Sequence, residues 1–128
     1  MLKVAAAIIQ DQEKMLICQR PPGKPLALLW EFPGGKVEPE ESFSECIVRE
    51  CLEELGIEVK VETVFAEYVY HYPEQAIHFV FFGCQIQKGI PQAKENQNFV
   101  WVKKSELEKY PFCPADQEVI QKLSQTDF

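Results

Sequence analysis

The amino-acid sequence predicts an α+β domain. Short segments rich in β-branched and aromatic residues indicate strands, and they lie both before and after one strongly predicted internal helix. A second helical segment closes the chain. Because the strands occur as hairpins, an α+β arrangement is favoured over a parallel α/β sheet.

The segments before the internal helix alternate between strand and turn. Residues 3–10 and 15–20 are apolar runs separated by a short polar stretch, which predicts a hairpin. Residues 21–29 are punctuated by prolines and are expected to form a loop. Residues 30–36 are expected to be a short extended piece that enters a turn at two consecutive glycines.

The internal helix is predicted from Ser42 to Leu55. Ser42 and Glu45 have the spacing of a capping box, and Gly56 fits the residue that commonly stops a helix. At 100° per residue, four apolar side chains gather on one face, which is expected to pack against a sheet. These side chains are Val48, Cys51, Leu52 and Leu55.

The second half of the chain is expected to return to strands. Two long strand segments are separated by a Pro-Glu-Gln turn, and a third follows a polar loop. The predicted order is strand 57–72, strand 76–86, loop 88–97, strand 98–104, helical turn 105–110 and helix 115–123.

Length and composition favour one domain spanning residues 1–128, as a monomer or homodimer. The net charge of −7 disfavours a nucleic-acid polymer as partner, but it is compatible with a small anionic ligand held by metal ions. No apolar run approaches the ~20 residues of a membrane span. Five cysteines, an odd number without a CxxC pair, favour reduced thiols in the cytoplasm.

The predicted helix concentrates acids near its C-terminal end. Glu50, Glu53 and Glu54 lie at i, i+3 and i+4, where like charges repel, and the helix dipole disfavours anions there. Arg49 is the one cation on the helix placed to relieve them. One explanation is a solvated acidic face. The other is a divalent-cation site, to which a carbonyl of the preceding glycines and the nearby Glu41 could contribute.

The spacing of the fixed residues decides between these explanations. The sequence reads Gly35, five residues, Glu41, seven residues, then Arg49-Glu50-Cys51-Leu52-Glu53-Glu54-Leu55-Gly56-Ile57. In this it resembles the Nudix family, whose signature has Gly, Glu, Arg-Glu, Glu-Glu and Gly at these spacings. Cys51 stands where that family usually has Leu or Ile, and it keeps the position apolar. Residues 30–36 and 111–120 extend the resemblance to MutT-type members over nearly the whole chain.

The resemblance implies the Nudix fold, an α/β/α sandwich with a mixed central sheet. MutT-type members split a nucleoside triphosphate into a monophosphate and pyrophosphate. The implied function is therefore a Mg²⁺-dependent enzyme, with Mn²⁺ as an alternative cation, that removes unwanted nucleotides from the pool. Such cations would bridge the triphosphate and the glutamates, neutralise developing charge and activate water.

By the same resemblance, the expected metal ligands are the Gly35 carbonyl, Glu50, Glu53, Glu54 and Glu95. Glu50 is the first candidate for the general base, and Arg49 would orient it through a hydrogen-bonded ion pair. For Arg49 the alternative is a plain i,i+4 pair with Glu53. For Glu95 the alternatives are an auxiliary base and a solvated loop acid. Glu41 is expected to support the site.

Residues outside the signature are expected to bind the nucleotide. By resemblance, Phe32 packs on the base and Arg20 lies near the nucleotide. Lys36 follows the glycines and is placed to meet a phosphate, and Tyr72 and Ile77 are expected in the same pocket. For the aromatic residues an ordinary core position is the alternative, and for Lys36 an ordinary surface position.

Asp116 is the most informative position for the choice of base. MutT-type enzymes selective for 8-oxoguanine have an Asn there, which accepts from N7–H and donates to O6. An ionised Asp only accepts, which suits an exocyclic amine such as cytosine N4 or adenine N6, unless burial protonates it. We expect 8-oxo-dGTP as the substrate, with CTP, modified dCTP or an oxidised adenine nucleotide as alternatives. A hydrolase of dinucleotides and a non-catalytic nucleotide-binding module are the remaining hypotheses.

Overall fold

The computed structural model describes residues 1–126, which form one mixed sheet with helices on it. The strands are β1 (Leu2–Asp11), β2 (Lys14–Gln19), β3 (Trp30–Glu31), β4 (Gly34–Lys36), β5 (Glu58–His71), β6 (Ala76–Lys88) and β7 (Asn98–Lys103). The α-helices are α1 (Phe43–Leu55) and α2 (Gln117–Ser124), and 3-10 helices η1 (Lys104–Lys109) and η2 (Pro114–Asp116) precede α2.

Strand β1 lies at the centre of the sheet. It pairs in parallel with β6, from Leu2↔Ile77 to Ile9↔Cys84, and antiparallel with both β2 and β4. The strand order is β3-β2-β1-β6-β5, with β4 paired to β1 and β7 paired to β2. The predicted hairpins β1–β2 and β5–β6 are present, and the α+β class with a mixed sheet is confirmed.

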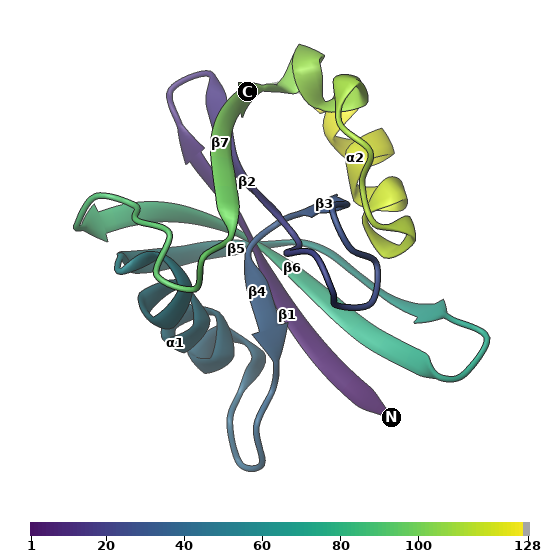
Figure 1. Ribbon diagram of the computed structural model, residues 1–128. Coiled ribbons are helices and arrows are strands. Elements are labelled where there is room, and N and C mark those ends of the chain that lie inside the picture. Colours follow the sequence, from purple (N-terminus) through teal and green to yellow (C-terminus); the bar gives the residue numbers. More distant parts are fainter. Residues whose placement is uncertain (127–128) are drawn as a thin grey trace.

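Helices cover both faces of this sheet, with α1 on one side and α2 on the other, as the α/β/α prediction requires (Figure 1). Successive side chains of a strand point to opposite faces, so β1 contributes to two apolar cores. Ala5, Ala7 and Ile9 pack in a cluster with the buried side of α1. Ala6 and Ile8 pack in a second cluster with α2.

Helix α1 begins and ends where the sequence predicts. The Ser42 hydroxyl accepts a hydrogen bond from the Glu45 N–H at 3.0 Å, and the Glu45 carboxylate accepts one from the Ser42 N–H at 2.8 Å. Gly56 ends the helix in the left-handed conformation, with φ of 67°, where a side chain would be strained.

The buried face of α1 differs from the prediction. Val48 and Leu52 are 37% and 55% exposed, so the expectation that both pack against the sheet is wrong. The buried side chains of the helix are Cys46, Ile47, Cys51 and Leu55. The helix therefore buries a face that is rotated relative to the predicted apolar face. As a result Glu50 and Glu54 turn inward and are half-buried.

The glycine pair before α1 also differs from the prediction. Gly34 and Gly35 lie in strand β4 and pair with Ala6 and Ala5, whereas a turn was expected there. A Cβ on Gly34 would lie 2.0 Å from the Ala5 carbonyl oxygen, so this strand approaches β1 more closely than a side chain allows.

The five cysteines are free and buried, which agrees with the prediction of unpaired thiols. Across the described residues 1–126, no helix has the length and apolar character needed to cross a membrane.

Candidate active site

Arg49 lies at the centre of a network of carboxylates beside α1. Its guanidinium contacts Glu41 through Nε at 2.7 Å and Nη2 at 2.9 Å, and Glu50 through Nη1 at 2.8 Å. Glu53 and Glu38 each lie 3.2 Å away. These interactions, above all the hydrogen bonds from Arg49, lower the pKa of Glu41 to about 2. Both predicted contacts of Arg49, with Glu50 and with Glu53, are therefore present together.

The carboxylate of Glu50 lies directly against Gly35. A Cβ on Gly35 would come within 2.2 Å of Glu50 Oε2, so any larger residue here would displace this carboxylate. Glu54 lies one helical turn further on. Burial, followed by the hydrogen bond and the charge of Glu50, raises the pKa of Glu54. The charge of Glu50 therefore disfavours the ionised form of Glu54 when no cation lies between them.

The loop between β6 and β7 closes over the C-terminal end of α1 (Figure 1). The backbone N–H of Gln92 donates to the Leu55 carbonyl at 2.9 Å, and that of Lys94 donates to the Glu54 carbonyl at 3.1 Å. These bonds satisfy carbonyl groups that a helix end leaves without partners. Glu95 follows in this loop, and its charge contributes to the raised pKa of Glu54. The loop thus brings a further acid toward the helix.

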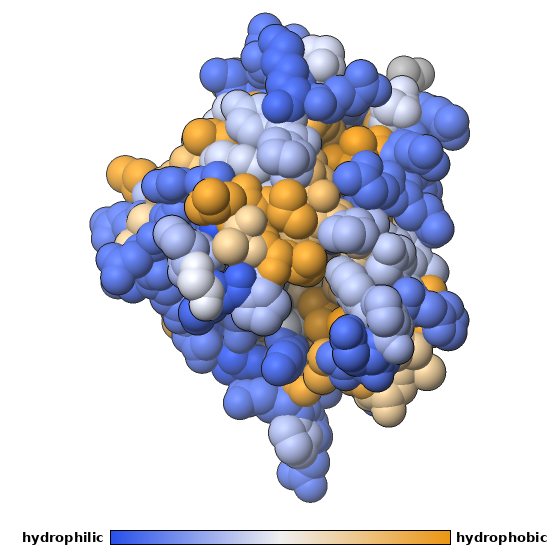
Figure 2. Space-filling model, turned by 45° about the vertical axis from the view of Figure 1, so that its right-hand side comes forward, coloured by the Kyte–Doolittle hydropathy of each residue, from blue (hydrophilic) through white to orange (hydrophobic). Residues whose placement is uncertain are grey.

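A cavity of about 530 Å³ opens next to this cluster. Gly35 lines the cavity and also contacts Glu50, so the two features meet at β4. Apolar wall residues include Leu2, Val4, Phe32, Tyr72, Ile77 and Phe79. Figure 2 shows apolar atoms lining a hollow between polar margins on the face that it draws. A pocket of this size with few polar groups is typical of a small-molecule site.

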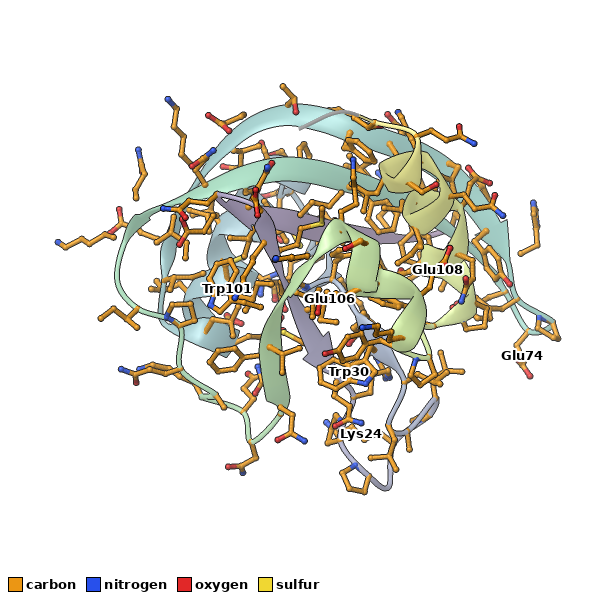
Figure 3. The ribbon with its side chains drawn as sticks, turned by 90° about the horizontal axis from the view of Figure 1, so that it is seen from above. Lys24, Trp30, Glu74, Trp101, Glu106 and Glu108 are labelled. Atoms are coloured by element: carbon orange, nitrogen blue, oxygen red, sulfur yellow. The ribbon has the colours of Figure 1, made fainter. Side chains whose placement is uncertain are left out.

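Two turns frame the mouth of the cavity. Pro25 and Leu26 line it from the loop at residues 21–29, and Glu74 lines it from the turn between β5 and β6. Figure 3 shows Glu74 at the tip of that hairpin, well away from Lys24 in the opposite loop. The cavity is therefore bounded by segments far apart in the sequence.

Asp116 is the buried acid of the cavity, with 5% of its surface exposed. Its Oδ2 accepts a hydrogen bond from the Phe32 N–H at 3.2 Å. Burial, followed by the charge of Glu31, raises the pKa of Asp116 well above its ordinary value. This shift stabilises the neutral carboxylic acid relative to the carboxylate, and the neutral form can donate a hydrogen bond as well as accept one.

Glu31 connects the cavity to the glutamates of α1. Its carboxylate lies 3.3 Å from Arg20, whose Nε also donates to the Pro25 carbonyl at 2.8 Å. The charge of Glu31 raises the pKa of both Glu54 and Asp116. Sequence reasoning missed this residue, because an acid beside Phe32 in a short strand carries no signal that distinguishes it from a surface acid.

All the residues predicted to bind substrate line the cavity, namely Arg20, Phe32, Lys36, Tyr72, Ile77 and Asp116. The predicted metal ligands divide into two groups. Glu50, Glu54 and Gly35 come together, with Glu95 on the neighbouring loop. Glu53 is exposed and pairs with Arg49 instead.

The donor atoms suit a hard divalent cation. They are carboxylate oxygens and the carbonyl of Gly35, which are the ligand types that Mg²⁺ prefers. In the part of the chain that the structure describes, no three acidic, cysteine or histidine side chains converge closely enough to enclose a metal ion. Arg49 engages two of the acids, Glu50 and Glu53. A bound cation would therefore require these side chains to turn, and it would relieve the repulsion between Glu50 and Glu54.

Comparisons with known proteins show the family and agree with the fold. A family model described as a NUDIX domain matches residues 4–122. The CTP pyrophosphohydrolase of Escherichia coli K12 is 43% identical over 116 residues, covering 91% of this chain and 86% of that protein. The 8-oxo-dGTP diphosphatase of Haemophilus influenzae is 32% identical over 123 residues, covering 95% of this chain and 90% of that protein.

Solved structures extend this similarity to three dimensions. The solution structure of the E. coli ORF135 protein has a TM-score of 0.84 at 39% identity, covering 98% of this chain and 89% of that one. A MutT structure from a study of Aliivibrio salmonicida and Vibrio cholerae has a TM-score of 0.83 at 32% identity, covering 98% of both chains.

Proposed function

Because the chain belongs to the Nudix family of hydrolases, we propose that it uses water to convert a nucleoside triphosphate into a nucleoside monophosphate and pyrophosphate. One observation carries this proposal. Gly35 lies between the cavity and the Glu50 carboxylate, so a base held in the cavity would direct its phosphates toward the acids of α1.

The clustered acids of α1 are the reason why we propose that cleavage requires divalent cations. We propose that the Gly35 carbonyl, Glu50, Glu54 and Glu95 hold Mg²⁺ or Mn²⁺, and that Glu53 joins them after leaving Arg49. The bound cations would offset the phosphate charge and lower the pKa of attacking water. Without them, a polyphosphate and this carboxylate cluster would repel each other.

The residues around Glu50 suit proton transfer. We propose Glu50 as the general base, because its carboxylate is held between Gly35 and the Arg49 guanidinium at 2.8 Å. Arg49 is itself fixed by the bidentate contact with Glu41. This chain of contacts limits the positions that the Glu50 carboxylate can adopt, which favours catalysis by a well-placed group. Glu95 remains the alternative base.

The cavity suits a base edge that presents a donor beside an acceptor. A neutral Asp116 carboxyl can accept from the N4 amine of cytosine and donate to its N3. Phe32 N–H holds only one of the two oxygens, at 3.2 Å, so the carboxyl retains hydrogen-bonding capacity for a base. We therefore propose a cytidine nucleotide as the preferred substrate, which the similarity to a CTP pyrophosphohydrolase supports.

8-Oxo-dGTP, the substrate favoured by sequence reasoning, is the second candidate. Its N7–H and O6 also form a donor–acceptor edge, which a protonated Asp116 could read. Relatives that include the H. influenzae 8-oxo-dGTP diphosphatase support it. The raised pKa of Asp116 is thus compatible with both bases, and relative rates will separate them.

A substrate panel tests the proposal. Pyrophosphate release should be measured with Mg²⁺ for CTP, dCTP, 5-methyl-dCTP, 8-oxo-dGTP and the ordinary triphosphates, and ranked by kcat/KM. We expect release only with a divalent cation, loss of release on chelation, and the highest kcat/KM for a cytidine nucleotide. A higher value for 8-oxo-dGTP would reverse the base assignment. Absence of pyrophosphate from every triphosphate would refute the hydrolase proposal.

A further inference from the structure

Gln97 is a buried polar side chain outside the Nudix signature. It follows Glu95 by two residues, in the loop that closes over α1, and 8% of its surface is exposed. Burying an amide is costly unless its donor and acceptor find partners. The partners of Gln97 therefore indicate why the residue lies there.

The side-chain amide of Gln97 joins the loop to α1. Its Nε2 donates to the backbone carbonyl of Glu54 at 3.1 Å, and its Oε1 accepts from the backbone N–H of Glu95 at 3.1 Å. The amide of Gln97 thus connects the backbone of Glu54 in α1 with the backbone of Glu95 in the loop. No other amino-acid side chain of this length offers a neutral donor and acceptor in this arrangement.

The backbone between the two loop residues is tightly turned. Asn96 has φ of 59°, a left-handed conformation that Asn tolerates better than most residues. The bond from the Glu95 N–H to Gln97 closes this turn, while Lys94 N–H donates to the same Glu54 carbonyl at 3.1 Å. Glu95 is therefore held on both sides by bonds that end at the helix or at Gln97.

We propose that Gln97 is a positioning residue for the hydrolysis reaction, which sets the place of Glu95 relative to Glu50 and Glu54. The inference rests on the proposed function, in which these three acids share the cations. The charge of Glu95 contributes to the raised pKa of Glu54, which agrees with a short distance between the two carboxyl groups. Gln97 itself does not contact the cavity, since it is absent from the residues that line it.

A double-mutant cycle tests the inference. Gln97→Met keeps a similar volume and removes both hydrogen bonds, and Glu95→Gln removes the acid. Outer-shell changes at metal sites typically cost 10- to 100-fold in activity or metal affinity. We expect Gln97→Met to lower kcat about tenfold and to raise the Mg²⁺ concentration for half-maximal rate, with a smaller change in KM for the nucleotide.

The cycle separates positioning from a merely structural role. If Gln97 acts through Glu95, then Gln97→Met lowers kcat no further in the Glu95→Gln background. Equal losses in both backgrounds would overturn the proposal. An unchanged kcat in Glu95→Gln would also overturn it, because Glu95 would then have no role in the reaction and there would be nothing for Gln97 to position. Both results leave the hydrolase proposal intact, since that fails only if the wild-type chain releases no pyrophosphate.

Asn98 offers a matched control. Its Nδ2 donates to Gln19 Oε1 at 2.8 Å, an exposed side-chain bond one residue further on that does not reach α1. Asn98→Ala should keep the wild-type kcat and Mg²⁺ dependence, and a loss equal to that of Gln97→Met would overturn the proposal.

If Gln97→Met does not fold, Gln97→Glu replaces it. Gln97→Glu keeps the acceptor for Glu95 but removes the donor to Glu54, so Glu95 N–H should stay protected from exchange while kcat falls. Full activity in Gln97→Glu would overturn the proposal.

Discussion

The acid cluster of α1 holds the half-buried Glu54 and the cavity holds the buried Asp116, but the two carboxyl groups have different partners. Asp116 receives a hydrogen bond from the Phe32 N–H. Glu54 faces another carboxyl, Glu50, with the charges of Glu31 and Glu95 nearby. Burial raises the pKa of both groups. A neutral Asp116 would therefore need no cation beside it, whereas a cation would relieve the repulsion within the cluster.

Glu50→Gln should give the largest loss of activity, and it changes the acid cluster without changing the cavity. Removing a proton-transfer group typically lowers the rate by 10²–10⁴, so we expect kcat to fall about 10²-fold or more. Without added cations the variant should unfold at the same or a higher temperature than the wild type, because one of the repelling carboxylates is gone. Steady-state kinetics and thermal unfolding measure both quantities.

Glu62→Gln is the matched control, since Glu62 is an exposed acid on β5. It should change neither kcat nor the unfolding temperature appreciably. A wild-type rate in Glu50→Gln would remove Glu50 from the base role and direct attention to Glu95.

Asp116→Asn should give an intermediate effect and tests the cavity alone. The Asn amide can still accept from Phe32 N–H, so the fold is preserved. A good bidentate contact to a base is worth about 1–3 kcal/mol of discrimination. Asp116 can also ionise and then only accepts, which suits the N4 amine of cytosine, whereas the Asn amide always keeps a donor for O6 of 8-oxoguanine. We therefore expect the ratio of kcat/KM for 8-oxo-dGTP over CTP to rise about tenfold. Competing both nucleotides in one assay measures this ratio directly.

Glu118→Gln makes the same carboxyl-to-amide change at an exposed position on α2 and should leave the ratio unchanged. An unchanged ratio in Asp116→Asn as well would mean that another cavity residue reads the base.

Leu52→Ala should give the smallest effect and tests the rotation of α1. Leu52 is 55% exposed, so its truncation should lower the free energy of unfolding by no more than about 0.5 kcal/mol. Ile47→Ala is the contrasting variant, because Ile47 is fully buried and such a truncation typically costs about 2–5 kcal/mol. Urea unfolding of both variants measures the difference, and equal losses would contradict the observed orientation of the helix.

Much of the fold could be predicted because its signals are local. The capping box at Ser42 and the stop at Gly56 set the ends of α1 through hydrogen bonds and backbone angles within a few residues. The face that α1 buries could be predicted only in part, since Cys51 and Leu55 are buried as expected whereas Val48 and Leu52 are exposed. Val48 and Leu52 are as apolar as the residues that pack, so composition alone does not distinguish them, and the packing of α1 on the sheet selects the face that is buried.

The same division applies to the candidate site. The signature places Glu50 and Glu54 one turn apart on α1, which the sequence specifies by itself through the helical period. Only the tertiary structure brings Glu31 and Gln97 to these acids, because neither residue is near them in the chain. Hydrogen bonds and charges between distant segments depend on how the strands and loops pack, and no local pattern encodes that packing.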